Sequence, residues 1–414
     1  IINMLPNMAK ILINSILIFF LSIILINTNL VGNFYWQVSS LFTDHNLLID
    51  WLECNSMGIN LFTSTEVICN TRKIPTFNYG HAILIFPWSE TINVFYRDYL
   101  PHIVIFLFII LTVKIIDPQK KIEILLLFLC LINPSTLLAY DRLNMDLFVY
   151  ILAITVCFNR IYFINWILTL FLSFIKIYPA ALFINIFFEN KKRTLTKIFL
   201  IIILLILFTI IYFFYFTDYI LYFLNNVSSG KAGYHYLFSL NSLPKIFKYI
   251  FNFNYQLLLL VFYSLFILAV IAIYKKSNSS LKDIGNDIYS YNSKLFMIGG
   301  YITLISYVIF SNWFYREIFL ILMIPYIVRA KINSRYNISS LLIYFFIARY
   351  FFIFIYSYIN IHDGITYVDS IRIFSLKFLL TITIKSIFDF IIMSMLTSIL
   401  FLKTKNYIQK FIFN

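Results

Sequence analysis

Clusters of polar and charged residues interrupt an otherwise apolar sequence, and their residue types could do chemistry. Aspartates can accept a proton, while arginine and lysine can bind an anion and asparagine can orient a polar ligand. Polar groups are costly in hydrocarbon and persist there mainly for function, so we expect the clusters to form one site at one membrane face. The clusters are Asp44 with Asp50, the stretch 141–146 (Asp-Arg-Leu-Asn-Met-Asp), the stretch 176–179 (Lys-Ile-Tyr-Pro) and the stretch 312–317 (Asn-Trp-Phe-Tyr-Arg-Glu).

Composition predicts the class of protein that must position these residues. Of 414 residues, 61% are hydrophobic and 12% are charged, and the mean hydropathy is +0.87. A soluble domain normally carries roughly 25% charged residues. We therefore expect an all-α, polytopic membrane protein. The net charge of +14 is attributed to membrane topology, and no nucleic-acid partner is expected.

Apolar segments predict about twelve transmembrane helices, with a range of roughly 11–13. Several are shorter than the ~20 residues of a perpendicular span, so the pieces around 102–188 are expected to be tilted, broken or re-entrant. The first segment lacks a small-x-small cleavage site and is interpreted as a retained helix. The expected spans are 11–27, 102–116, 122–139, 146–159, 161–175, 178–188, 198–216, 255–274, 295–310, 317–329, 340–358 and 376–402.

The distribution of basic residues predicts an inner (plasma) membrane protein with both termini in the cytoplasm. With that orientation, the long first loop at 28–101 lies outside and carries six acids against three bases. A second external loop is expected at 217–254, within a single integral membrane domain spanning 1–414. The basic groups then placed inside are those at 114–121, 160, 191–197, 275–294, 329–335 and 403–410.

Sequence signatures of soluble enzymes are absent, including the dinucleotide and Walker loops, H-E-x-x-H and paired C-x-x-C. The five histidines have no metal-ligand spacing, and neither a metal nor another cofactor is predicted. Cys54 and Cys69 share the first external loop and could close a disulfide in an oxidising compartment.

Five short motifs follow one another between Asp44 and Pro325. They are Asp44 followed by Met57-Gly58-Ile59-Asn60-Leu61-Phe62, then Phe77-Asn78-Tyr79-Gly80, Asp141-Arg142-Leu143-Asn144-Met145-Asp146-Leu147, Lys176-Ile177-Tyr178-Pro179, and Ser311-Asn312-Trp313-Phe314-Tyr315-Arg316. In this order they resemble the GT-C superfamily of membrane glycosyltransferases, in particular the polyprenol-phosphate-mannose-dependent mannosyltransferases of glycosyltransferase family 87. Gly80 and Asp141 depart from that family's usual proline and glutamate.

The resemblance implies transfer of mannose or another hexose or pentose from a polyprenyl-phosphate carrier to a lipid-linked or cell-surface glycan acceptor. A carboxylate in reach of the acceptor hydroxyl would act as base. Asp44 is the candidate and Asp50 the fallback, although a capping or solvated role for Asp44 stays open. The implied partners are the lipid-linked sugar, the acceptor and membrane lipids.

Positive and amide side chains supply the candidate substrate-binding residues. Arginine and lysine can hold the phosphate, and Asn144 can orient sugar hydroxyls. Asp146 could instead cap the next helix, and the arginines could pair with neighbouring acids. Arg349 lies deep in an expected span, where a lipid phosphate and an internal ion pair are equally open. The candidates are Asn78, Tyr79, Arg142, Asn144, Asp146, Lys176, Tyr315, Arg316 and Arg349.

Two other function classes fit the same composition. A surface-polysaccharide polymerase or ligase would use a lipid-linked oligosaccharide in place of one sugar. A lipid-linked oligosaccharide flippase or secondary transporter would move its substrate without covalent change, typically through repeated halves around a midplane site. The long first external loop and the absence of mirrored halves favour the glycosyltransferase.

Overall fold

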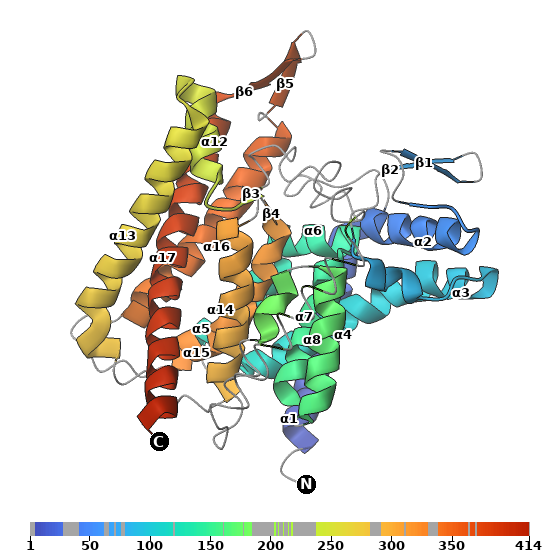
Figure 1. The fold of residues 1–414 in the computed structure, drawn as a ribbon, viewed down its shortest axis with the longest axis horizontal. Helices are drawn as coiled ribbons and strands as arrows, with labels where there is room; N and C mark the ends of the chain where they lie inside the picture. Colours follow the sequence, from blue (N-terminus) through green and yellow to red (C-terminus); the bar gives the residue numbers. More distant parts are fainter. Residues whose placement is uncertain are drawn as a thin grey trace.

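Helices dominate the computed structural model, and most stand side by side while a few elements of the first loop lie across them (Figure 1). The start of α1 and the end of α17 lie at the same end of this arrangement. The structure describes residues 5–27, 41–61, 66–69, 72–75, 79–118, 121–159, 161–176, 178–183, 237–281, 291–309, 312–329, 338–362, 365–368 and 371–413, with the single positions 203, 206, 210, 214 and 217.

Four helices in the described residues are long and apolar enough to cross a membrane. A bent pair, Lys121–Ile132 with Pro134–Arg142, raises the number to five if it forms one span. The described part of the chain thus suits a helical membrane protein, while the twelve expected crossings remain a prediction. The expected spans 178–188 and 198–216 lie largely outside the described residues. The four helices are Ala9–Asn27, Glu90–Ile116, Tyr255–Lys275 and Leu376–Asn406.

The first part of the chain contains α1, the elements of the loop at 28–101 and the helix that follows this loop. After α1 (Leu5–Asn27) come α2 (Thr43–Ser56), the antiparallel strands β1 (Glu66–Cys69) and β2 (Arg72–Pro75), the 3₁₀ helix η2 (His81–Ile85), and a continuous helix made of α3 (Glu90–Val94), the π-helical turn η3 (Phe95–Tyr99) and α4 (Leu100–Ile116). Cys54 and Cys69 form a disulfide that joins the end of α2 to β1. The disulfide that the sequence allowed is present.

The middle of the chain consists of short helices that end near the site. These are α5 (Lys121–Ile132), α6 (Pro134–Arg142), α7 (Met145–Phe158), α8 (Tyr162–Ile175) and η4 (Tyr178–Ala181). A 43° bend separates α5 from α6. Asn133 serves both ends of this break, since its Nδ2 donates to the Leu129 and Cys130 carbonyls and its Oδ1 accepts from the Thr136 N–H.

The part of the chain from residue 237 onward packs against this middle part. It contains β3 (Leu237–Phe238), α12 (Ser242–Phe251), α13 (Tyr255–Leu281), α14 (Tyr291–Ile309), β4 (Asn312–Trp313), η7 (Phe314–Met323), α15 (Ile324–Arg329), α16 (Ile338–His362), the hairpin of β5 (Ile365–Val368) and β6 (Ile371–Phe374), and α17 (Leu376–Phe413). The short strands β3 and β4 pair antiparallel.

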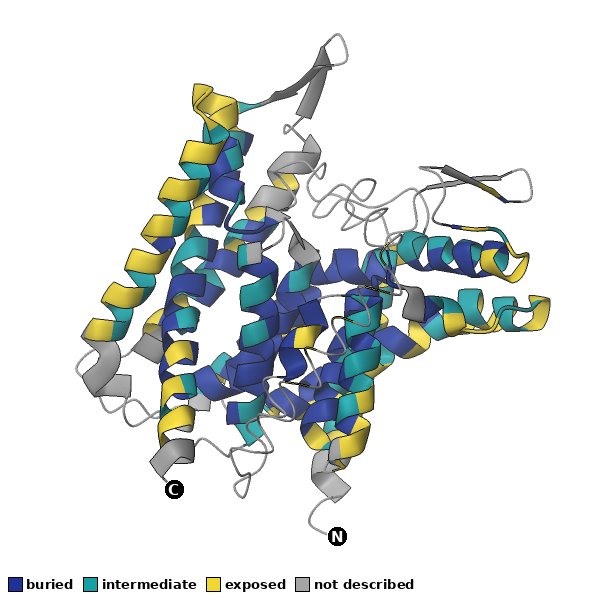
Figure 2. Cartoon of the chain, in the orientation of Figure 1, coloured by how far each residue is buried: buried dark blue, intermediate teal, exposed yellow. Residues whose placement is uncertain are grey.

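The expected span at 317–329 is wrong as a continuous α-helix. The segment is a 3₁₀ helix followed by the short helix α15, and the residues from Ile318 to Ile324 are all buried. Its apolar side chains pack inside the protein. A segment buried in this way has the same apolar composition as a helix that faces lipid, so composition cannot distinguish the two. α13 shows the opposite pattern, with an exposed apolar face along most of its length (Figure 2).

Two buried apolar clusters hold these elements together. The larger runs from α4 through α7, α14 and η7 to α17. The smaller lies beneath α2 and includes Trp51, Tyr79, Met145 and Ile175. This cluster joins the loop at 28–101 to the start of α7 and the end of α8. It therefore holds the loop next to the residues that form the candidate site.

Candidate active site

Asp44 lies in the first turn of α2, directly against the end of α6. The chain enters α2 through Phe42, which has a left-handed backbone (φ 58°) and whose N–H donates to the Asp141 carbonyl at 2.6 Å. The Asp44 Oδ1 atom lies 2.9 Å from Arg142 Nε and 2.7 Å from its Nη2. The other carboxylate oxygen, Oδ2, accepts from Asn144 Nδ2 at 2.6 Å.

The tight turn between α6 and α7 presents both of these partners. Arg142 is the last residue of α6, and Leu143 adopts a left-handed backbone (φ 43°) that ends the helix. Asn144 then caps α7, because its Oδ1 accepts from the Asp146 N–H at 3.0 Å. The capping role considered for Asp146 therefore belongs to Asn144.

Asp146 is fully buried and gathers three partners from distant parts of the chain. Its Oδ1 pairs with Lys176 Nζ and accepts from the Tyr178 hydroxyl at 2.6 Å. Its Oδ2 lies 3.3 Å from Arg316 Nε, within ion-pair distance. A buried carboxylate is tolerated when it is paired in this way.

Lys176 joins the two carboxylates into one cluster. Its Nζ donates to Asn144 Oδ1 at 3.3 Å, so that Asn144 contacts both Asp44 and Lys176. The same ammonium lies 5.3 Å from the centre of the Tyr79 ring, at cation–π distance.

Gly80 sets the position of Tyr79. Its N–H donates to the Ile175 carbonyl at 2.9 Å, at the end of α8. A Cβ atom at this position would lie 1.5 Å from the Phe174 carbonyl oxygen. Only glycine allows this close approach, because any residue with a Cβ atom, proline included, would clash with the Phe174 carbonyl.

Together these side chains form what we call the open cluster: Asp44, Arg142, Asn144, Asp146, Lys176 and Arg316. These six described residues include three cations and two carboxylates, so together they carry a net charge of +1. The side chains of Asp44, Arg142 and Arg316 are 14%, 22% and 19% exposed, whereas that of Asp146 is 0% exposed. The cluster is therefore buried at Asp146 and accessible at Asp44, Arg142 and Arg316. Its net positive charge suits an anion.

Asp50, the alternative base, lies outside the open cluster. It pairs with Arg97 Nη2 at 2.7 Å, and the two side chains are 25% and 30% exposed. Arg97 also donates to Asn93 Oδ1 at 2.8 Å. This partly exposed pair links α2 to the π-helical turn η3.

Two further predicted residues cannot be placed as side chains. Asn78 lies outside the described residues, and for Tyr315 the structure describes the backbone in η7 alone. Their predicted roles stay predictions.

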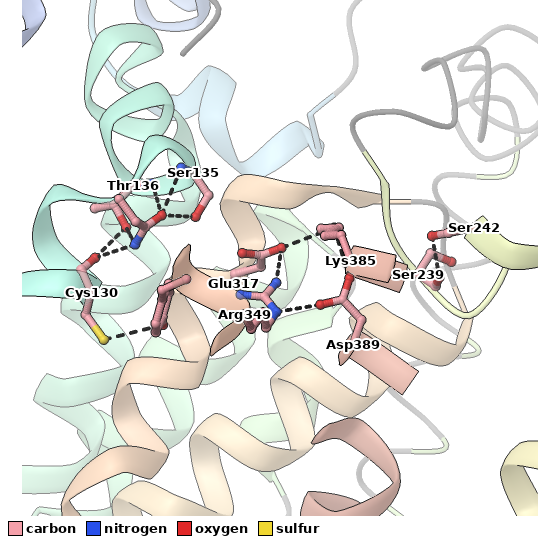
Figure 3. A network of polar contacts seen from close by, with 11 residues as sticks. Cys130, Ser135, Thr136, Ser239, Ser242, Glu317, Arg349, Lys385 and Asp389 are labelled. Atoms are coloured by element: carbon pink, nitrogen blue, oxygen red, sulfur yellow. Dashed lines mark hydrogen bonds and ion pairs between the residues drawn. The ribbon is translucent and has the colours of Figure 1, made fainter. Parts of the chain in front are cut away.

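Arg349 belongs to a second group, the sealed cluster, formed by Glu317, Arg349, Lys385 and Asp389 (Figure 3). Arg349 pairs with Glu317 and lies 2.5 Å from Asp389 Oδ1, while Lys385 Nζ lies 2.9 Å from Asp389 Oδ2 and 3.5 Å from Glu317 Oε1. All four side chains are at most 2% exposed. Of the two roles left open for Arg349, the structure shows the internal ion pair.

Several residues of these clusters were not singled out from the sequence. Tyr178 lies in a recognised motif, but its hydroxyl contact with Asp146 required the fold. Lys385 and Asp389 do carry a sequence signal, because they are charges four residues apart in an apolar segment, where charges mark function or pairing.

His45, next to Asp44, anchors α2 to the following helix. Its Nε2 lies 2.7 Å from the Tyr96 carbonyl oxygen, and the ring is buried. Burial lowers the pKa of His45 from the usual 6.5; the bond to the Tyr96 carbonyl opposes this shift, and the positive charge of Arg97 adds to it. Burial therefore favours the neutral imidazole, whose protonated Nε2 can still donate to the Tyr96 carbonyl.

No group of three His, Cys, Asp or Glu residues that could hold a metal ion occurs in the described ranges. Chemically, the open cluster offers one partly exposed carboxylate beside three cations and an amide. No family model matches the sequence, and searches of curated proteins and of solved structures also give no match.

Proposed function

We propose that this chain is a membrane glycosyltransferase that moves one sugar from a polyprenyl-phosphate donor to a lipid-linked or glycan acceptor. The observation that carries the proposal is the position of Asp44, whose carboxylate contacts Arg142 and Asn144 on the rim of the open cluster. A proton acceptor and a group of phosphate-binding cations thus lie side by side. The resemblance of the motifs to polyprenol-phosphate-mannose-dependent enzymes supports the same chemistry.

The reaction needs a base and an anion site in close reach. The acceptor hydroxyl oxygen forms a new bond to the anomeric carbon of the sugar, and the bond from that carbon to the phosphate oxygen breaks. The hydroxyl proton passes to the Asp44 carboxylate, and polyprenyl phosphate leaves with the bonding electron pair. Arg142, Lys176 and Arg316 stabilise the charge that develops on the phosphate.

The charge of the open cluster matches such a donor. A sugar joined through one phosphate to a polyprenyl chain is a phosphodiester with a single negative charge. The three cations exceed the two carboxylates by one, so the bound donor would neutralise the site. Arginine provides a planar fork that suits phosphate oxygens.

The proposed site lies on the extracytoplasmic face of the inner membrane, with the N- and C-termini in the cytoplasm. The helix α2, which carries Asp44, lies toward the end of the bundle opposite the start of α1 and the end of α17 (Figure 1). The disulfide between Cys54 and Cys69 supports an oxidising environment for this loop. An active site at the outer surface lets the lipid carrier remain in the bilayer during transfer.

The test is an assay of the purified protein in proteoliposomes with radiolabelled polyprenyl-phosphate sugars and a membrane lipid extract. Transfer of a single sugar is expected, and Asp44→Asn should reduce it by at least about a hundredfold, within the range for loss of a general base. Asp98→Asn is the matched control, because Asp98 is an exposed aspartate of the same loop.

Each alternative outcome identifies another class. Near-normal turnover by Asp44→Asn removes this residue from the mechanism. Transfer of a whole oligosaccharide indicates a polymerase or ligase, and movement of the lipid-linked sugar without a covalent product indicates a flippase or transporter.

A further inference from the structure

The open and sealed clusters are joined by two consecutive residues of η7. Arg316 contacts Asp146 in the open cluster, and Glu317 contacts Arg349 and Lys385 in the sealed cluster. A movement of one residue therefore displaces the other.

η7 is an unusual element on which to mount a binding residue. It runs for ten residues as a 3₁₀ helix, whereas such helices seldom exceed three or four residues because their hydrogen bonds are poorly aligned. An element of this kind needs contacts from outside to hold its geometry. The surrounding structure provides them on three sides.

Two of these contacts are made by backbone and by close packing. The strand β4, directly before η7, pairs with β3 so that Asn312 lies opposite Phe238. On another side α14 approaches η7 so closely that a Cβ atom on Gly299 would lie 2.8 Å from the Phe319 carbonyl oxygen. These contacts fix the beginning and the middle of the element.

The third contact is the sealed cluster, and it is made by side chains of α16 and α17. Arg349 pairs at once with Glu317 and Asp389, and its guanidinium carbon lies 5.7 Å from the Phe238 ring centre. In Figure 3 the side chains of Glu317, Arg349, Lys385 and Asp389 point toward one another. Arg349 thereby connects η7, β3 and α17.

We propose that Arg349 is a positioning residue that holds Glu317, and through it Arg316, in the geometry required by the open cluster. The helices α16 and α17, which carry no motif of the resembling family, would in this way determine where a site residue lies. The catalytic meaning of the inference rests on the proposed function, but its test does not.

The test measures where position 316 lies without using any substrate. Arg316→Cys is reacted with an anionic and with a cationic methanethiosulfonate reagent. The labelling rates are compared in two backgrounds, of which the first is the otherwise unchanged parent chain. The unsubstituted chain reports background labelling, since its free cysteines Cys130 and Cys157 are buried.

The second background is the double variant Glu317→Gln with Lys385→Met. It removes one charge of each sign, so Arg349 and Asp389 still pair and the buried cluster stays neutral. We expect the thiol introduced at position 316 to react on the order of fivefold faster or more in this background, because the segment is no longer held. The preference for the anionic reagent should also fall as the side chain leaves the positive field of Arg142 and Lys176.

Two matched variants separate positioning from general loosening. Lys403→Met removes another buried lysine of α17, which contacts Ser293 and the Tyr326 ring of α15, and it should leave the labelling rate unchanged. Arg349→Lys keeps the charge but loses the guanidinium fork, so it should give an intermediate rate. Equal rates in the parent and double-variant backgrounds would overturn the proposal, whether or not the chain transfers sugar.

Discussion

The open and sealed clusters use the same kinds of side chain in different ways. In the sealed cluster two cations balance two carboxylates, and all four side chains are at most 2% exposed. In the open cluster three cations face two carboxylates, and part of the cluster reaches the surface. Balanced charge without access describes a structural element, whereas a net positive charge with access describes a site that can accept an anion.

The comparison also shows why charge alone is a poor guide to function in an apolar chain. Arg349 and Arg316 both lie among hydrophobic residues in the sequence. Their roles differ because Arg349 finds carboxylates on two sides, from η7 and α17, while Arg316 lies at the rim of a cluster with excess positive charge.

The largest expected effect comes from leaving the sealed cluster unbalanced. Arg349→Met should reduce the free energy of unfolding by about 3–5 kcal/mol, because two buried carboxylates would keep a single partner, Lys385. The charge-neutral double variant Glu317→Gln with Lys385→Met should lose much less. Denaturant unfolding in detergent measures both, and equal losses would contradict the importance of charge balance.

In the open cluster the expected loss is in activity. Arg142→Gln should lower sugar transfer on the order of a hundredfold, as for removal of one donor to a developing charge. Its stability should change by no more than about 1 kcal/mol, because the pair with Asp44 is partly exposed.

Arg97→Gln provides the control for this variant. It breaks the exposed pair with Asp50 in the same loop, outside the open cluster. Transfer should remain close to normal. If both arginine variants lose activity equally, the effect comes from the loop as a whole. That result would contradict a specific role of Arg142 and Asp44 in transfer.

A third variant disturbs the open cluster without changing a charge. Gly80→Ala places a Cβ atom against the Phe174 carbonyl and should displace Tyr79 from Lys176. A destabilisation of about 1–3 kcal/mol is expected for such overpacking. Thermal unfolding can compare it with Gly58→Ala, whose position has free space but a positive φ of 76°, with an expected loss of about 1 kcal/mol.

The smallest expected effect is on the pH dependence of stability. It arises from His45, which anchors α2, the helix that carries Asp44. The folded state holds the pKa of His45 below 6.5, so the unfolded chain takes up the proton first as the pH falls. Stability should therefore decrease as the pH falls through 6.5 and level off below the folded pKa. His45→Gln should flatten this part of the stability curve, and an unchanged slope in thermal melts would assign the pH dependence to other groups.

The sequence predicted which residues form the open cluster better than it predicted the contacts between them. The motifs placed Asp44, Arg142, Asn144, Lys176 and Arg316 at the ends of segments on one side, and the structure brings them together. Their individual contacts depend on turns such as the left-handed residue that ends α6, which no periodicity reveals. Asn144 rather than Asp146 therefore turned out to cap the helix.

The last third of the chain was harder to predict for a different reason. An apolar run is compatible with an α-helical span, and the sequence gives no sign that residues 314–323 form a 3₁₀ helix wrapped by other helices. Without that element the partners of Arg349 could not be identified. The count of spans likewise depends on segments beyond the described residues.

The contacts of Asp44 have a stereochemical consequence. A carboxylate oxygen has two lone pairs. Oδ1 faces the Arg142 guanidinium and Oδ2 accepts from Asn144, so these contacts reduce the directions from which a proton can reach the carboxylate. If Asp44 acts as the proposed base, a hydroxyl must approach from a direction that the Arg142 and Asn144 contacts leave open. Regioselectivity toward one hydroxyl of a polyol acceptor would then follow from how one aspartate is tethered.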